Sequence, residues 1–272
     1  MTTLTFVDVG QGDCTVGSDD SGAAFLIDCP EGASERALHV LRESDADVLE
    51  LVVATHNDLD HIGGLYAVVT AFPTRTLRIN DATVLPSDPK ERARLKATLR
   101  ALSGLQRDGV YLESAKAGDS GAVGEFTWEV LAPDQAQLLY AQGTGNPNHA
   151  SIVSMLRAHG FKILIAGDAD GRSWRNLLSA GSDLSADVLL VPHHGARMQG
   201  TANGADISEL LSAVDPQLCV LSFGPNGYGH PASYTLAALV ATSACVASTG
   251  NLVMPGGNTP WRVGTIALVY DG

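Results

Sequence analysis

The chain has 272 residues, of which 45% are hydrophobic, and its formal net charge is −13. Hydrophobic content at this level is typical of a globular protein with a sizeable core. Proteins that hold long duplex nucleic acid rely on positive charge, because phosphate contacts supply most of their affinity. The acidic balance therefore argues against tight, non-specific binding of duplex DNA.

The N-terminal segment MTTLTFVDVG lacks the basic region, apolar core and cleavage site of a secretory signal. No apolar run approaches the roughly 20 residues that span a bilayer. Four cysteines lie far apart and form no C-x-x-C pair, which favours small buried thiols in a reducing compartment: Cys14, Cys29, Cys219 and Cys245. These features predict a cytoplasmic protein without a membrane segment.

Short apolar segments rich in Val, Ile and Leu predict strands, and segments of helical period lie between them. In chain order, strands are expected at 4–9, 23–29, 48–55, 126–132, 151–156, 162–168, 187–193, 218–224 and 264–271. Helices are expected at about 33–43, 61–72, 90–104, 171–180, 205–213 and 233–242. This order predicts an α/β protein with mixed sheets covered by helices. Without an internal repeat or a low-complexity linker, we expect residues 1–272 to form a single domain.

The expected helix at 90–104 carries much of the positive charge, since eight of the 17 Lys and Arg residues fall between Arg75 and Arg107. Asp88 is suited to cap this helix and Pro89 to occupy its first position. Two faces then follow, one with Leu95, Leu99 and Leu102 and the other with Arg92, Lys96 and Arg100. The basic face is interpreted as an ordinary solvated surface, and the alternative is a local patch that faces phosphate.

The densest group of potential ligands is the stretch THNDLDHIGG at 55–64, directly after the expected strand at 48–55. It contains His56, Asp58, Asp60 and His61. Their spacing on a tight loop lets four side chains converge on a small volume, which suits two metal ions better than one. Gly63 and Gly64 are expected to let the following helix pack close beside this site.

Further candidate ligands follow other apolar strands or glycine-rich turns: Asp168, His193, His194, His230, Asn148 and His149. Asp168 ends KILIAGD, and a carboxylate has two oxygens with which it can bridge two cations. Asp170 is expected instead to cap the helix that begins after it. Four such strand ends, together with the dense loop, predict a metal centre.

The motifs FVDVGQGDC, THNDLDHIGG, NHASIVSML, ILIAGDAD, DVLLVPHHG and SFGPNGYGHP resemble, in order and spacing, the metallo-β-lactamase-fold hydrolase domain of the ComEC competence DNA-uptake family. The resemblance runs from about residue 4 to residue 240. It implies a four-layer αββα sandwich with a dinuclear metal site along one edge of the two sheets. The membrane channel of the uptake proteins has no counterpart here, so a stand-alone soluble relative is expected.

Matched by motif, the metal ligands implied by the resemblance are His56, Asp58, Asp60, His61, His149, Asp168 and His194. Asp168 would bridge the two ions. Asn148 matches its motif at least as well as His149, and His194 is favoured over His193 for the HHG motif. The GQGDC turn leaves open whether Asp13 reaches the site. The candidate catalytic residues are Asp60, His193 and His230.

Two divalent ions, zinc or manganese, would activate a water and stabilise charge on a phosphoryl oxygen. The predicted function is therefore that of a metal-dependent hydrolase, most specifically a phosphodiesterase or nuclease. Its substrate would be an anionic phosphodiester, small or single-stranded in view of the acidic chain. The alternatives are hydrolysis of another ester, such as a phosphorylcholine ester or a lactone, and a non-catalytic interaction protein that keeps the fold.

Asp58 stands where the superfamily pattern H-x-H-x-D-H has a histidine. Together with Asp60 and Asp168 it brings the charge of the implied ligands to three negative charges, so that two divalent cations and one hydroxide give a nearly neutral centre. A further oxygen ligand also favours manganese or magnesium over strict zinc preference. The sequence predicts no oligomeric state.

Overall fold

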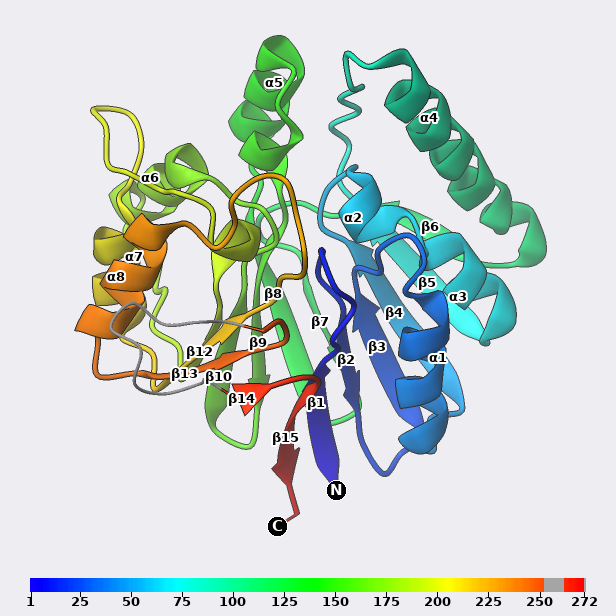
Figure 1. Ribbon diagram of the computed structural model, residues 1–272. Coiled ribbons are helices and arrows are strands. Elements are labelled where there is room, and N and C mark those ends of the chain that lie inside the picture. The colour runs from blue at the N-terminus through cyan, green and yellow to red at the C-terminus, as the bar shows by residue number, and fades with distance from the viewer. Residues whose placement is uncertain (252–261, 272) are drawn as a thin grey trace.

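The computed structural model describes residues 1–251 and 262–271. Two β-sheets face each other, and helices cover the outer face of each sheet (Figure 1). The predicted αββα sandwich is therefore confirmed. In the described ranges, none of the helices has both the length and the apolar character that crossing a bilayer requires.

The first sheet has the strand order β15-β1-β2-β3-β4-β5-β6. Its strands are β1 (Thr2–Phe6), β2 (Thr15–Ser18), β3 (Ala23–Ile27), β4 (Val48–Ala54), β5 (Thr74–Ile79), β6 (Tyr111–Ser114) and β15 (Ile266–Tyr270). Strands β3 to β6 run parallel, whereas β15, β1, β2 and β3 pair antiparallel. The outer face is covered by α1 (Ser34–Glu43), α3 (Leu65–Ala71) and α4 (Pro89–Gly104).

The second sheet has the order β14-β13-β12-β11-β10-β9-β8-β7. Its strands are β7 (Ser120–Val123), β8 (Phe126–Ala132), β9 (Val153–Ala158), β10 (Phe161–Ile165), β11 (Val188–Leu190), β12 (Leu218–Leu221), β13 (Cys245–Ser248) and β14 (Arg262–Val263). Strands β10 to β14 run parallel. On its outer face lie α6 (Gly171–Ser179), α7 (Ile207–Val214) and α8 (Ser233–Ala241).

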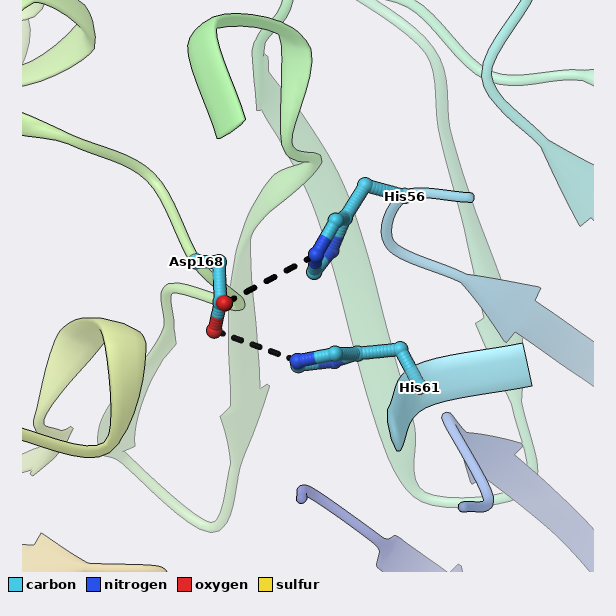
Figure 2. A group of neighbouring side chains, drawn as sticks. All are labelled: His56, His61 and Asp168. Atoms are coloured by element: carbon cyan, nitrogen blue, oxygen red, sulfur yellow. Dashed lines mark ion pairs between the residues drawn. The ribbon is translucent and has the colours of Figure 1, made fainter. Parts of the chain in front are cut away.

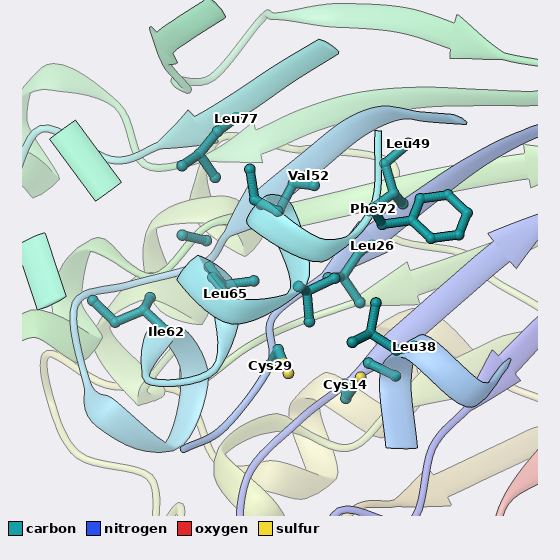
Figure 3. Packing of buried hydrophobic residues seen from close by; sticks show 14 of the residues in the cluster. Cys14, Leu26, Cys29, Leu38, Leu49, Val52, Ile62, Leu65, Phe72 and Leu77 are labelled. Carbon is teal, nitrogen blue, oxygen red and sulfur yellow. The ribbon is translucent and has the colours of Figure 1, made fainter. Parts of the chain in front are cut away.

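Apolar side chains form three layers of core, one between the sheets and one beneath each layer of helices. Figure 3 shows the layer under α1 and α3, where the thiols of Cys14 and Cys29 lie among leucines. Cys219 is also buried, and all four cysteines are free, as predicted. Cys245 is exposed, so the prediction of burial is wrong for this residue, which begins β13 at the strand's outer end.

The remaining elements are the ten-residue helix α5 (Gln135–Thr144) and four short ones: α2 (Leu59–Ile62), η1 (Leu105–Asp108), η2 (Pro147–Ala150) and η3 (Pro192–Gly195). The helix expected at 61–72 is divided into α2 and α3 at Gly63 and Gly64. Both glycines have right-handed backbone angles, with φ of −62° and −96°. They are needed for close packing, because a Cβ at Gly64 would lie 2.4 Å from the Pro30 carbonyl oxygen.

Three capping predictions are confirmed. Asp88 accepts hydrogen bonds from two backbone amides at the start of α4, with Pro89 in the first helical position. Asp170 caps α6 in the same way. The strands that the sequence did not predict, such as β2 (TVGS) and β6 (YLES), lack an apolar run, so hydrophobic pattern alone does not reveal them.

Candidate metal centre

The loop after β4 brings its four polar side chains to the edge of the sandwich. His56 and His61 are fully buried, whereas the side chains of Asp58 and Asp60 are about one-third exposed, at 37% and 35%. Asp58 lies at the N-terminal end of α2, but its carboxylate makes no hydrogen bond to the helix amides. Burial would raise the pKa of Asp58, yet the nearby His56 outweighs it and lowers the pKa. The carboxylate therefore stays available to the site.

The carboxylate of Asp168 faces the rings of both His56 and His61 (Figure 2). Its Oδ2 is 3.7 Å from His56 Nε2, and its Oδ1 is 3.1 Å from His61 Nε2. Burial would raise the pKa of Asp168, but the surrounding histidines, His61 foremost, hold it well below its usual value. The preceding Gly167 has φ +50°, and a Cβ there would lie 2.5 Å from Ser151 Oγ, so only glycine fits this approach.

His193 and His194 reach the same carboxylate from η3. Both residues have φ of 52°, in the left-handed region that side chains other than glycine rarely adopt. This backbone directs both rings at Asp168, with His193 Nε2 3.4 Å from Oδ2 and His194 Nε2 3.5 Å from Oδ1. The sequence analysis favoured His194 over His193 as a ligand. The structure places His193 beside Oδ2 of Asp168 and His194 beside Oδ1.

The cluster thus divides about the two oxygens of Asp168. On what we call the Oδ1 side lie His61, His194 and Asp60, whose Oδ2 is 3.8 Å from His194 Nε2. The Oδ2 side contains His56, His193 and Asp58, whose Oδ2 is 3.6 Å from His56 Nε2. Each side therefore offers two imidazole nitrogens, one carboxylate and one oxygen of the shared aspartate.

Asp28 lies behind the Oδ1 side and was missed by the sequence analysis. Its Oδ2 is 2.7 Å from His61 Nδ1, and it also accepts hydrogen bonds from the backbone amide and hydroxyl of Thr55. The Thr55 hydroxyl is in turn 3.1 Å from His56 Nδ1. A proton on Nδ1 of His61 leaves the Nε2 lone pair facing Asp168, as a metal-ligating histidine requires.

His194 is oriented in a similar way by groups from two other loops. Its Nδ1 lies 3.0 Å from the Ser222 carbonyl oxygen and 3.4 Å from Asp13 Oδ1. Burial would lower the pKa of His194, but the carboxylates of Asp168 and Asp13 raise it to about 9. The GQGDC turn thus brings Asp13 behind the site.

The donor atoms at the middle of this cluster are buried and lack hydrogen-bond partners among the described residues: His56 Nε2, His61 Nε2, His194 Nε2 and Asp168 Oδ1. Buried polar atoms without partners are rare in proteins, and here they face one another across distances suited to a shared cation. Four overlapping groups of three residues have ligand atoms within 4.8 Å of one another. Imidazole nitrogen and carboxylate oxygen are ligands that zinc and manganese accept. The residues therefore fit divalent metal ions.

Comparison with known proteins agrees with this geometry. The sequence model of the Metallo-beta-lactamase superfamily matches residues 7–200. The chain belongs to this superfamily. It is 26% identical over 247 residues to ComE operon protein 3 of Bacillus subtilis, covering 84% of this chain and 29% of the relative. It is 28% identical over 187 residues to competence protein ComA of Neisseria gonorrhoeae, covering 67% and 21%. The predicted family resemblance is confirmed, although the chain spans less than a third of either relative.

Two solved structures have a similar fold at low sequence identity. Zinc-bound PqqB from Methylobacterium extorquens matches with a TM-score of 0.59 and 14% identity, over 99% of this chain and 100% of that one. CmlA, a diiron β-hydroxylase from Streptomyces venezuelae, matches with a TM-score of 0.57 and 15% identity, over 98% and 54%. These likenesses concern the fold alone.

Asn148 and His149 are adjacent in sequence, but their side chains lie at different places relative to the cluster. Asn148 borders the cluster, with its Nδ2 3.4 Å from His193 Nε2, and its Oδ1 is buried without a hydrogen-bond partner among the described residues. The His149 ring lies away from Asp168 and its Nδ1 is 2.5 Å from Asp170 Oδ2. The structure thus brings six of the seven predicted ligands together and leaves His149 outside the group.

The additional carboxylates change the predicted charge of the centre. The sequence count included Asp58, Asp60 and Asp168 only. Asp13 and Asp28 add two buried acidic groups directly behind the histidines. The centre therefore offers a stronger negative potential to cations than the sequence indicated. The signal that could have identified Asp28 is its position after the buried strand β3, like Asp168 after β10.

The cluster opens into a cleft of about 890 Å³. His193 and His230 line this cleft, with ring centroids 5.2 Å apart, and so do Arg92 and Arg94 from α4. Arg92 donates to the carbonyls of Pro86 and Ser87, and Arg94 forms an ion pair with Glu31. Part of the basic helix therefore faces the metal centre, and the interpretation of α4 as only a solvated surface is incomplete.

Proposed function

We propose that this protein is a metal-dependent phosphodiesterase, with nucleic acid strands or short oligonucleotides as the favoured substrates. The observation that carries the proposal is the grouping of histidines and aspartates about the two oxygens of Asp168, next to a cleft lined by arginines. Two cations beside one exposed cleft suit an ester that carries negative charge.

The residues that would hold the ions are those of the two sides of Asp168, with Asn148 at the border. Bound there, two divalent ions supply Lewis-acid activation of the phosphoryl group and of the attacking water. Asp60, one-third exposed at the base of the cleft, accepts a hydrogen bond from that water and orients it. His230, which lines the cleft beside His193, donates a hydrogen bond to a non-bridging phosphoryl oxygen or protonates the leaving oxygen.

The volume and the lining residues of the cleft limit which substrates can bind. Its volume of about 890 Å³ accommodates a few nucleotides. Arg92, which has no ion pair among the described residues, supplies positive charge on the wall where Arg94 is paired with Glu31. Tyr228, with 74% of its surface exposed, lines the opening and offers an aromatic face on which an unpaired base can stack. These features favour a single strand over a duplex. The competence proteins to which the chain is similar support the same substrate class.

The test compares hydrolysis of bis(p-nitrophenyl) phosphate and of a single-stranded oligonucleotide by protein loaded with Mn²⁺ or Zn²⁺. The double change Asp60→Ala/His61→Ala is expected to abolish both activities, while His39→Ala/Asp47→Ala removes the same groups from exposed positions and leaves them unchanged. If the loaded wild-type protein leaves both substrates intact, the proposal fails. Turnover of a phosphorylcholine ester or a lactone in the same panel would then favour another hydrolase, and failure to bind metal would favour an interaction protein.

A further inference from the structure

A second pocket lies beside the metal cleft, on the other side of η3. Its volume is about 350 Å³, which is within the range of small-ligand sites. His193 lines both hollows, and η2 contributes Asn148 to the metal cleft and His149 to the second pocket. The two sites are therefore neighbours on one face of the protein.

Two arginines bring positive charge to the second pocket. Arg172 and Arg197 both line it, and neither forms an ion pair with a carboxylate in the described parts of the chain. The Arg172 guanidinium lies 3.7 Å from the centre of the Tyr140 ring, which holds it in place. Arg197 donates to the Gln199 side chain at 2.8 Å and also lies near the ring of Tyr234.

The acidic residue among the described residues that line this pocket is Asp170, and its oxygens are already engaged. Oδ1 accepts from the backbone amides of Arg172 and Ser173 at the start of α6, and Oδ2 contacts His149 Nδ1. The pocket thus keeps an excess of positive charge in a chain of net charge −13. Cationic side chains that line a pocket without carboxylate partners are suited to an anion, and arginine matches phosphate with two parallel donors.

The rest of the lining suits a nucleoside rather than a bare ion. Tyr140 and Met198 supply apolar surface, and Asn203 supplies amide donor and acceptor groups. The Tyr140 ring also contacts His149, with centroids 4.9 Å apart, so aromatic groups lie together at one wall. Because Arg172 covers one face of the Tyr140 ring, a base would be recognised here through apolar contact and hydrogen bonds to Asn203 rather than by stacking on that face.

We propose that this arginine pocket binds a nucleotide through its phosphate, with Arg172 and Arg197 as the phosphate-binding residues. The phosphate belongs to the terminal nucleotide of a substrate whose scissile ester lies in the metal cleft, or to a free mononucleotide. The assignment to a substrate terminus rests on the proposed phosphodiesterase function, whereas the binding of a nucleotide does not.

The first experiment uses protein freed of metal with a chelator, so that phosphate cannot bind at the metal centre. Calorimetric titration with a nucleoside 5′-monophosphate is expected to show binding, whereas the nucleoside alone binds at least about tenfold more weakly. Arg172→Gln/Arg197→Gln is expected to weaken mononucleotide binding by at least about tenfold as well. The matched control, Arg75→Gln/Arg157→Gln, removes equal charge from ion pairs elsewhere and leaves the affinity unchanged.

Unchanged affinity in the pocket variant, or an equal loss in the control, would overturn the proposal. Circular dichroism checks the fold of each variant, and Arg197→Gln alone, at an exposed side chain, provides a second test if the double variant does not fold. This outcome is independent of hydrolysis, so a failure of the phosphodiesterase proposal is distinguishable from a failure of this one.

The second experiment identifies the source of the phosphate, using loaded enzyme and oligonucleotides with or without a terminal phosphate. If the pocket holds the substrate terminus, the pocket variant raises KM for the phosphorylated oligonucleotide about tenfold and leaves hydrolysis of bis(p-nitrophenyl) phosphate unchanged. If the pocket holds a free mononucleotide, that ligand binds without competing with the oligonucleotide. Both patterns support phosphate binding in the pocket and assign its source.

Discussion

The two sides of Asp168 offer similar ligands but differ in what lies behind them. On the Oδ1 side, both histidines are fully buried, and each has a carboxylate behind it, Asp28 or Asp13. On the Oδ2 side, His56 has the neutral hydroxyl of Thr55 behind it, and the His193 side chain is 31% exposed. The first side is therefore more rigid and more negative than the second.

This difference implies unequal affinity for metal at the two sides. Carboxylates hydrogen-bonded to ligating histidines increase their basicity and fix their orientation. Exposure of His193 and Asp58 to the cleft allows solvent and substrate to compete for the other position. We therefore expect the Oδ1 side to bind its ion more tightly and the Oδ2 side to exchange ions and meet the substrate.

Removal of Asp168 tests the feature that both sides have in common and has the largest expected effect. Asp168→Ala takes one ligand from each side and leaves four imidazoles without their central carboxylate. Loss of several kcal/mol of charge stabilisation lowers phosphodiester hydrolysis about 10³-fold or more. Steady-state rates and elemental analysis provide the measurement. Retention of two tightly bound ions in this variant would show that the sides do not depend on a common bridge.

Removal of one histidine from each side tests the predicted inequality directly. His61→Ala is expected to abolish tight metal binding, whereas His56→Ala is expected to leave about one tightly bound ion, because its side is the weaker. Calorimetric titration with Mn²⁺ measures both stoichiometry and affinity. Equal residual binding in the two variants, each with a folded circular dichroism spectrum, would contradict the comparison.

Asp28→Asn tests the carboxylate behind the stronger side. Asn keeps the shape and tolerates the left-handed backbone of this residue, with φ of 60°, but it removes the charge. Metal affinity of the Oδ1 side is expected to fall about 10- to 100-fold, as is typical when such a supporting carboxylate is lost. The matched control is Asp45→Asn, another aspartate with positive φ, at 53°, on the exposed surface. Equal metal affinities in wild type, Asp28→Asn and control would exclude the supporting role.

Asp58→His alters the weaker side and has the smallest expected effect, a several-fold change in metal preference. Replacing a hard oxygen ligand with imidazole favours Zn²⁺ over Mn²⁺. Competition titrations with the two ions give the ratio of their affinities, and activity with each ion gives a second readout. An unchanged ratio would show that Asp58 is not a metal ligand.

Much of the centre was predictable because its ligands follow strand ends. Apolar runs identify buried strands, and the carboxyl ends of parallel neighbours such as β10, β11 and β12 lie at one edge of a sheet. Polar residues directly after those runs, such as Asp168 and His194, are therefore placed together by pattern alone. The fold was predictable for the same reason, together with the resemblance that the motifs carry.

His149 shows that the hydrophobic pattern does not predict which way a side chain points in a short turn. A one-residue step along η2 separates Asn148, which faces the metal cleft, from His149, which faces the arginine pocket. Periodicity is not defined in such a short 3₁₀ turn, and the direction of each side chain depends on contacts with α5 and α6. Sequence analysis therefore placed His149 among the ligands and kept Asn148 only as the alternative.

The position of Asp28 and the grouping of ligands on the two sides of Asp168 could be found only from the tertiary structure, for a different reason. Asp28 follows β3 without any neighbouring histidine, and only the pairing of β3 with β4 brings it beside Thr55 and His61. The division of ligands between Oδ1 and Oδ2 depends on consecutive left-handed residues at His193 and His194, which no propensity predicts. The sequence alone determined the superfamily, the strands with a long apolar run and most of the polar residues near the centre. Only the folded chain decided which atoms face one another, because that depends on contacts between segments far apart in sequence.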